Sequence, residues 1–200
     1  MCNHYRLNPQ DIENWADWSG YNLRKEQDTV RGDIWPEKQA TVIRRSGEEV
    51  IADAMQWGFV RRVPGKREGT TKKIVTTNVR ELTSPYWKSM LAEPARHCLV
   101  PFTSFAEPVM GGGRAEHWFT LPARPVAMFA GLWRPTELGN CFAFLTCEPN
   151  PLVAPLHPKA MPVILHPEDY EHWLTCGYEH ACSLALPHPS QLMEVASDSP

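Results

Sequence analysis

Cys2 has the most unusual chemical potential in the chain, because it follows Met1 directly. If Met1 is removed, which a small neighbouring side chain favours, residue 2 presents an α-amine and a thiol on adjacent carbons. The amine has an ordinary pKa of about 7.7–8.0, so it can condense with an aldehyde to a Schiff base near neutral pH. The thiol can then add to the imine carbon and close a thiazolidine ring. A terminal Cys is thus suited to covalent capture of an aldehyde, but its position alone favours the alternative of a chance cysteine at a frayed terminus.

A second feature is the concentration of positive charge between Arg61 and Lys73. This stretch holds six Lys or Arg side chains against one acidic residue, Glu68, and it contains Pro and Gly. Charge runs of this kind are usually solvated loops, and contact with phosphate is the functional alternative.

The composition excludes several classes of protein. A chain of 200 residues fits one domain with a sizeable core, and 42% hydrophobic residues with eight Trp exclude disorder for most of it. The net charge of −3 excludes a molecule that is basic throughout, so binding to nucleic acid needs a local basic patch. We expect a single domain over residues 1–190 and a flexible tail over 191–200.

The six cysteines raise the question of disulfides or zinc. The N-terminal residues lack the apolar segment of a secretory signal, and no apolar run approaches the ~18 residues of a membrane span. We therefore expect a cytoplasmic protein with reduced thiols and no membrane partner. No Cys-x-x-Cys motif occurs, and we expect no metal and no cofactor.

The elements that must position these residues are mostly short strands. Residues 41–45 and 48–60 flank a Ser46-Gly47 turn, which predicts a hairpin. Further short runs rich in β-branched and aromatic residues, each bounded by Gly or Pro, predict additional strands. These runs are residues 73–79, 98–105, 116–121, 126–133, 141–146 and 161–165.

Three helices are predicted among the strands. Asn8-Pro9 begins one that ends at Gly20, Ser84-Pro85 begins a second, and Pro167 begins a third. Strands without regular βα alternation favour an α+β fold with a mixed or antiparallel, barrel-like sheet surrounded by a few helices.

Several short motifs are each weak evidence alone, but they occur in the chain in a specific order and spacing. They are Met1-Cys2, Met55 to Gly58, Thr77 to Glu81, Cys98 to Pro101 leading to Phe105-Ala106-Glu107, Ala130 to Trp133, Phe144 to Thr146, and His157 to Leu165. Through them the chain resembles, over nearly its whole length, the SOS response-associated peptidase (SRAP) family, which includes proteins that cross-link to abasic sites in single-stranded DNA.

The resemblance implies a catalytic group of Cys2, Asn78, Glu107 and His157. Cys2 is the nucleophile, and Asn78 orients its terminal amine without titrating. Glu107 moves protons during imine formation, with a pKa that burial would raise. His157 helps the closed sugar of the abasic site open to its aldehyde, because imidazole titrates near neutral pH.

The resemblance also implies contacts with DNA, at positions where this chain departs from the family. Arg80, on the strand face of Asn78, would hold a phosphate, and His4 stands where members commonly carry an arginine. After Trp57-Gly58 the family usually continues to a Pro and a Trp that stack on DNA, whereas here Arg61 and Arg62 would replace stacking with charge. Trp57 is itself either core or a base-stacking residue. The acid of the site is kept, but the aromatic residues that surround it in the family are absent.

Three functions fit these residues. The leading hypothesis is a monomeric protein that cross-links abasic single-stranded DNA through Cys2, associates with the nucleoid when bound to damage, and processes its own N-terminus. The second is an N-terminal-nucleophile cysteine hydrolase that acts on small amides or peptides. The third is a non-covalent binding module for single-stranded or modified DNA, in which Cys2 is incidental.

Overall fold

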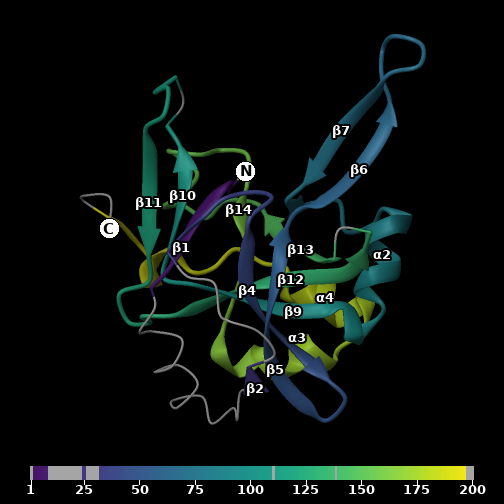
Figure 1. Ribbon diagram of the computed structural model, residues 1–200. Helices are drawn as coiled ribbons and strands as arrows, with labels where there is room; N and C mark the ends of the chain where they lie inside the picture. The colour runs from purple at the N-terminus through teal and green to yellow at the C-terminus, as the bar shows by residue number, and fades with distance from the viewer. Residues whose placement is uncertain (1, 9–23, 26–31, 110, 138, 197–200) are drawn as a thin grey trace.

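The fold is described from a computed structural model, which places residues 2–8, 24–25, 32–109, 111–137 and 139–196. Figure 1 shows two β-layers and a set of short helices gathered on one side of the larger layer. The expected α+β class with a barrel-like sheet is confirmed. The expected helix between residues 8 and 20 lies outside the described residues.

The larger sheet closes on itself around five strands. Neighbours pair antiparallel in the order β13–β12–β9–β4–β5, and a parallel pairing of β5 with β13 completes the ring through Gln56–Cys141 and Trp57–Phe142. Closure surrounds an aromatic interior in which Phe129 packs on Phe144. The ring strands are β4 (Gln39–Ser46), β5 (Glu49–Trp57), β9 (His97–Phe102), β12 (Ala127–Thr136) and β13 (Gly139–Cys147).

Short strands extend this barrel at its margins. The predicted hairpin is confirmed as β4 and β5, and Gly47 supplies the positive φ of 64° that its turn requires. The predicted strand over residues 161–165 is two short strands that pair with different neighbours. The marginal strands are β2 (Arg24–Lys25), β8 (Asn78–Val79), β14 (Met161–Pro162) and β15 (Ile164–Leu165).

The smaller sheet has the order β16–β11–β10–β1–β3. The predicted strand over 98–105 divides at Thr103, because β9 belongs to the barrel and β10 to the smaller sheet. The amide of Thr103 donates to the carbonyl of Arg6 at 2.8 Å, which fastens the crossing point to β1. The strands are β1 (His4–Leu7), β3 (Gly32–Ile34), β10 (Ser104–Pro108), β11 (Glu116–Thr120) and β16 (Glu194–Val195).

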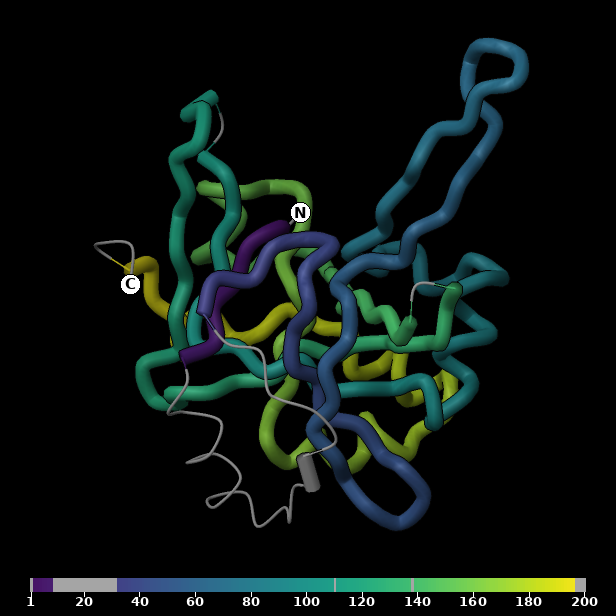
Figure 2. The backbone as a smooth tube through the Cα atoms, viewed as in Figure 1, coloured from purple at the N-terminus to yellow at the C-terminus, as the bar shows by residue number. Residues whose placement is uncertain are grey.

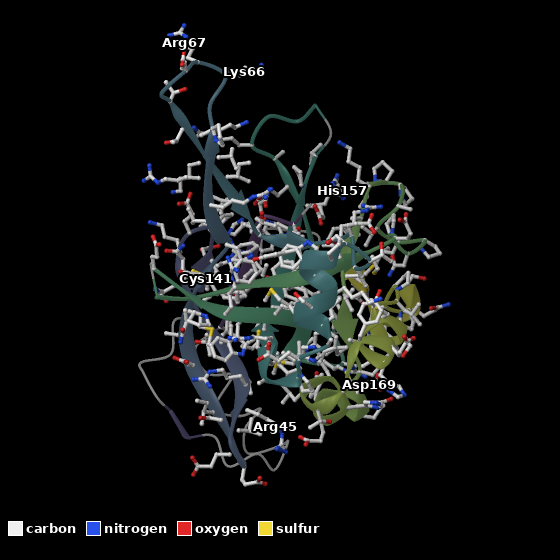
Figure 3. All side chains as sticks on the ribbon, turned by 90° about the vertical axis from the view of Figure 1, so that its right-hand side faces the viewer. Arg45, Lys66, Arg67, Cys141, His157 and Asp169 are labelled. Carbon is white, nitrogen blue, oxygen red and sulfur yellow. The ribbon has the colours of Figure 1, made fainter. Side chains whose placement is uncertain are left out.

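The basic segment forms a hairpin rather than a loop. β6 (Phe59–Pro64) pairs antiparallel with β7 (Thr71–Thr76), so the predicted strand over 73–79 ends before β8 begins. The hairpin stands away from the body, and the β10–β11 hairpin extends from the same end of the molecule (Figure 2). Lys66 and Arg67 occupy its tip (Figure 3).

The helices pack outside the barrel. The two that the proline signals predict are found, and the Ser84 hydroxyl accepts from the amide of Trp87 as an N-cap. A third helix, α4, was not predicted, because its sequence has no capping side chain. No helix in the described ranges is both long and apolar enough to cross a bilayer. The helical segments are α2 (Pro85–Leu91), η1 (Pro94–Arg96), η2 (Pro167–Asp169), α3 (Tyr170–Thr175), α4 (Tyr178–Leu184) and η3 (Ser190–Leu192).

The described part of the C-terminal segment contacts the smaller sheet. Strand β16 pairs with β11, and the amide of Ala196 donates to the carbonyl of Trp118 at 2.9 Å. Met193, directly before β16, is buried. Residues 194–195 thus add a strand to the edge of the smaller sheet.

Candidate functional site around Cys2

Cys2 lies just before β1 and has no exposed surface. Its Sγ donates to the carbonyl of His4 across 3.4 Å, and its own carbonyl accepts from Asn78 Nδ2 at 3.2 Å. Two contacts thus fix the main chain and the thiol of this residue. The N-terminal end of β1 is a defined position and not a frayed one.

Asn78 reaches Cys2 from the barrel. It is the first residue of β8, which pairs in parallel with β13 so that Asn78 lies opposite Phe144. Its side chain is buried, and an amide so placed can donate to a carbonyl without changing its charge. Through this hydrogen bond, β8 at the margin of the barrel fixes Cys2, the residue at the start of the smaller sheet.

Glu107 and His157 complete the group from two other elements. Glu107 lies on β10, the partner of β1, where His4 is opposite Ala106. His157 ends the turn before β14, and its Nδ1 lies 3.5 Å from Glu107 Oε2 and 2.9 Å from the carbonyl of Ala160. Both side chains are buried.

The turn that carries His157 is ordered by Asn150. The side-chain oxygen of Asn150 accepts from the amides of Leu152 and Val153 at 3.1 and 3.0 Å. The amide of His157 then donates to the carbonyl of Val153 at 2.8 Å. Four separate parts of the chain thus bring Cys2, Asn78, Glu107 and His157 together.

Burial sets the protonation of this group. It raises the pKa of Glu107 to about 7, so the carboxyl is divided between its acid and its carboxylate near neutral pH. Burial, with the negative charge of Glu107, raises the pKa of the Cys2 thiol well above its ordinary value. Burial lowers the pKa of His157. Near neutral pH the site therefore holds a protonated thiol, a neutral imidazole and a carboxyl that can either accept or donate a proton.

Arg80 lies beside this group on the surface. It follows β8 and is exposed, unlike Asn78, so the two residues do not share a strand face as predicted. Its Nη2 donates to Glu148 at 2.7 Å, and its Nη1 donates to the carbonyl of Lys159, two residues after His157. The guanidinium is thus held at the edge of the turn that carries His157.

Arg61 and Arg62 are exposed on β6. They lie opposite Ile74 and Lys73 of β7, so they belong to the basic hairpin and not to the buried group. The two kinds of predicted residue are separated in space: the catalytic candidates are buried, and these cationic candidates are on a projecting surface.

Trp57 does not have the exposure that base stacking requires. Its side chain has no exposed surface, packs on Phe144 with ring centroids 5.3 Å apart, and donates from Nε1 to the carbonyl of Thr77 at 3.0 Å. The core interpretation is the one that the structure supports, because barrel closure places β5 against β13 at this residue.

His4 is likewise not available to a phosphate. Its Nδ1 lies 2.8 Å from Glu116 and its Nε2 lies 2.8 Å from Asp33, so both ring nitrogens face carboxylates. This arrangement does not support the expected contact of His4 with a phosphate, because both ring nitrogens already have partners within the smaller sheet.

One residue near the site was missed by sequence reasoning. Trp35 follows β3, stacks on His4 with ring centroids 3.7 Å apart, and is 45% exposed. The dipeptide Trp35-Pro36 is a turn signal that could have drawn attention to it. Among the described residues, no group of three or more His, Cys, Asp or Glu side chains is placed to hold a metal ion.

Comparisons with known proteins concern the family and the fold of the chain. The family model described as SOS response associated peptidase (SRAP) matches residues 1–197. No curated protein matches the chain. A crystal structure from Bordetella bronchiseptica is similar at 26% identity with a TM-score of 0.77, and the alignment covers 100% of both chains.

Two further crystal structures share the fold at lower identity. One, from Bacteroides thetaiotaomicron, has 19% identity and a TM-score of 0.73, with 96% of this chain and 90% of that chain covered. The other, a phage-related protein from Bordetella bronchiseptica, has 20% identity and a TM-score of 0.67, with 96% and 91% covered.

Proposed function

The chain belongs to the SOS response associated peptidase (SRAP) family, and from this premise we propose that it cross-links to abasic sites in single-stranded DNA through Cys2 once Met1 has been removed. Family membership associates the chain with the SOS response to DNA damage. The proposal goes beyond family membership, because it specifies the lesion that is recognised, the bond that forms and the residues that form it.

The proposed reaction has two bond-forming steps. The α-amine of Cys2 attacks the aldehyde carbon of the opened sugar, and the carbinolamine loses water to give an imine. The thiol sulfur then adds to the imine carbon, and its proton passes to the nitrogen. The product is a thiazolidine, and the only molecule released is one water.

Glu107 is the proposed proton carrier for the first step, the formation of the imine. Its carboxylate accepts a proton from the Cys2 ammonium, and its acid form returns a proton to the departing hydroxyl. A pKa of about 7 suits both tasks, because the carboxyl then exchanges protons readily in either direction near neutral pH. His157 is the proposed acid and base for opening the sugar, since its neutral imidazole lies 3.5 Å from the Glu107 carboxyl.

The observation that carries the proposal is the way in which Cys2 is held in place by its neighbours. Its carbonyl is held by Asn78, and its thiol is buried beside Glu107. A main chain fixed in this way keeps the amine of residue 2 and the thiol on one rigid unit, which lowers the entropic cost of closing the ring. Arg80 beside this group, and Arg61 and Arg62 on the hairpin, are the proposed contacts with DNA phosphates.

The raised pKa of the Cys2 thiol favours this chemistry over a thiolate hydrolase. Cysteines that attack carbonyls directly usually have a lowered pKa, whereas the Cys2 thiol is protonated near neutral pH. In the imine route the amine forms the first bond, and the thiol loses its proton only as it adds.

The test uses a single-stranded oligonucleotide with one abasic site, analysed by denaturing gel and intact mass. Wild type is expected to give a heat-stable adduct whose mass is that of the protein without Met1 plus the oligonucleotide less one water. Cys2→Ala keeps an amine but has no thiol, so its adduct is expected only when a borohydride reductant traps the imine. Cys182→Ala, in α4, is the matched control and should behave as wild type.

Two results would contradict the proposal: Cys2→Ala forms the stable adduct without reductant, or the protein that forms the adduct retains Met1. Turnover of a small amide in the absence of DNA would favour the hydrolase instead.

We also propose that Cys2, Glu107 and His157 assist the cleavage of the bond after Met1. The mass of Glu107→Ala purified from cells tests this step. Retention of Met1 is expected if cleavage is autocatalytic, whereas a fully exposed Cys2 terminus would assign it to another peptidase.

A further inference from the structure

We infer that Trp35 is a nucleobase-stacking residue, which takes a base of single-stranded DNA onto the indole face opposite His4 while the β6–β7 hairpin binds the strand's phosphates. The inference rests on the proposed function for the identity of the strand. It assigns the stacking contact to a residue that the sequence motifs did not indicate.

Trp35 has the exposure that the role requires. It is 45% exposed, whereas Trp57 is fully buried and Trp118 is 4% exposed. A nucleobase needs an open aromatic face, and stacking tolerates any base because every base has a π-face. One face of Trp35 is covered by His4, so a base would stack on the other.

The support beneath Trp35 is rigid. His4 is held between Asp33 and Glu116 through both ring nitrogens, and the edge of its ring also packs on Trp118 with centroids 4.6 Å apart. The His4 and Trp35 rings lie nearly parallel, with an interplanar angle of 20°, so the imidazole covers one face of the indole. A ring fixed by contacts on two strands gives Trp35 a defined orientation before any ligand arrives, which reduces the ordering cost of binding.

The backbone that carries Trp35 is a tight turn. The amide of Lys38 donates to the carbonyl of Trp35 at 3.1 Å, Pro36 occupies the second position, and Glu37 has a φ of 67°. This is the pattern of a type II turn, in which a positive φ at the third position normally calls for Gly or Asn. A glutamate in that conformation is uncommon, and the surrounding contacts must maintain it.

Those contacts join the turn to the root of the basic hairpin. The amide of Glu37 donates to the carbonyl of Trp57 at 2.7 Å, and the amide of Trp57 donates to the carbonyl of Lys38 at 2.9 Å. The carboxylate of Glu37 accepts from Lys73, which lies opposite Arg62 on the hairpin. Trp35 is therefore presented beside the strand pair that carries the charge.

The charges around Trp35 favour nucleic acid over an acidic or apolar partner. Arg6 pairs with Asp33, Lys73 pairs with Glu37, and His4 lies between the carboxylates of Asp33 and Glu116. Each acidic side chain beside Trp35 thus has a partner, while the β6–β7 hairpin holds five further cationic side chains and one Glu. A neutral aromatic face beside a cationic groove or arm is the arrangement that binds the bases and phosphates of a single strand.

Trp35 also lies near Cys2 along the sheet. Tyr5 pairs with Ile34, so Trp35 neighbours His4, which is two residues from Cys2, or about 7 Å along a strand. A base on Trp35 would belong to a nucleotide close to the one at Cys2. Stacking on Trp35 would position the DNA strand, whereas Cys2 would react with the abasic site.

The test compares two probes that cannot cross-link. One is a single-stranded oligothymidylate, and the other is an oligomer of the same length made of tetrahydrofuran abasic analogues, which has phosphates but neither bases nor aldehydes. Binding of each is measured by fluorescence anisotropy at fixed salt. Trp35→Ala is expected to weaken binding of the oligothymidylate about 5- to 150-fold and to leave the base-free probe unchanged.

Three further variants separate stacking from support. Trp35→Phe keeps an aromatic face and should bind close to wild type, and Trp35→Leu covers His4 without one and should bind like Trp35→Ala. Leu186→Ala, an exposed apolar residue elsewhere, is the matched control and should bind as wild type. Equal binding of the oligothymidylate by wild type and Trp35→Leu overturns the inference, as does an equal loss on both probes.

The outcome is independent of the cross-linking test. If wild type forms no adduct with abasic DNA but Trp35→Ala still loses base-dependent binding, the proposed chemistry fails and the stacking site stands. If the adduct forms at the wild-type rate and yield in Trp35→Ala with unchanged binding of both probes, the stacking site fails and the chemistry stands.

Discussion

Replacing Glu107 by Gln tests how burial prepares this site. The pKa of Glu107 is raised from 4.5 to about 7 because its carboxyl has no exposed surface. Below pH 4.5 the Glu107 carboxyl is protonated in both the folded and the unfolded chain, so its titration does not change the free energy of unfolding. As pH rises from 4.5 through about 7, the unfolded chain releases its proton first, so the folded state loses stability relative to it. The loss is complete above about pH 7.

The size of this loss follows from the shift. At about 1.4 kcal/mol per pKa unit, the rise to about 7 corresponds to about 3 kcal/mol of destabilisation at pH 8 relative to pH 4. For a chain of this length, about 3 kcal/mol corresponds to about 6–12 °C in Tm. The Gln side chain of Glu107→Gln has nearly the same shape and does not titrate. The unfolding free energy of this variant should therefore not show the loss of about 3 kcal/mol between pH 4 and pH 8.

The assay is thermal unfolding at pH 4, 6 and 8 for wild type, Glu107→Gln and Glu168→Gln. Other titrating groups contribute equally to all three proteins and cancel in the difference. Glu107→Gln should gain about 3 kcal/mol relative to wild type between pH 4 and 8. Glu168→Gln, at an exposed position, should gain nothing. Parallel pH profiles for wild type and Glu107→Gln would refute the reasoning that burial raises this pKa.

The same variant tests the proposed role in the reaction. A carboxyl that transfers protons contributes about 100- to 10,000-fold to a rate, so cross-linking by Glu107→Gln should slow by that order while its stability at pH 8 rises. A variant that is both stable and slow separates the chemical role from a structural one.

Three other predictions concern the core and the hairpin. Trp57→Ala should cost about 3–5 kcal/mol in unfolding free energy measured by urea denaturation, because the side chain is fully buried; a loss below 1 kcal/mol would contradict its core position. Gly131→Ala should cost about 1–3 kcal/mol by thermal unfolding, because its new Cβ would lie 2.7 Å from Cys98 Sγ, and an unchanged Tm would refute the close approach. Arg62→Ala should reduce the slope of log binding constant against log salt for single-stranded DNA by about 0.7, and an identical slope would exclude a phosphate contact.

The sequence predicted local features whose causes are local. The Ser46-Gly47 turn, the Ser84-Pro85 cap and the Pro167 start appear where expected, because each depends on a few residues that fix φ, supply a cap or end a helix. The helix α4 was missed because no capping side chain marks it, and packing against the other helices must compensate. The hairpin of β6 and β7 was predicted as a loop because the sequence Val60-Arg61-Arg62-Val63 does not alternate apolar and polar residues as a half-buried strand does.

The family motifs also indicated which residues gather at Cys2. Four residues from distant parts of the chain meet there, and only a family pattern could relate them, since no spacing rule connects residues 2, 78, 107 and 157. Their roles in the reaction remain predictions until the Cys2 and Glu107 variants are measured.

The sequence by itself determined which side chains are present, the turns and caps that depend on neighbours, and the class of fold. Tertiary structure alone decided which side chains are accessible and what they pair with. Trp57 and Trp35 are the same residue type, yet closing the barrel buries the first and a type II turn exposes the second. His4 is placed between Asp33 and Glu116 because three strands meet there, and Glu107 acquires its raised pKa because the same sheet removes it from water. Exposure and desolvation are sums over contacts that are distant in sequence, and so they follow only once the chain has folded.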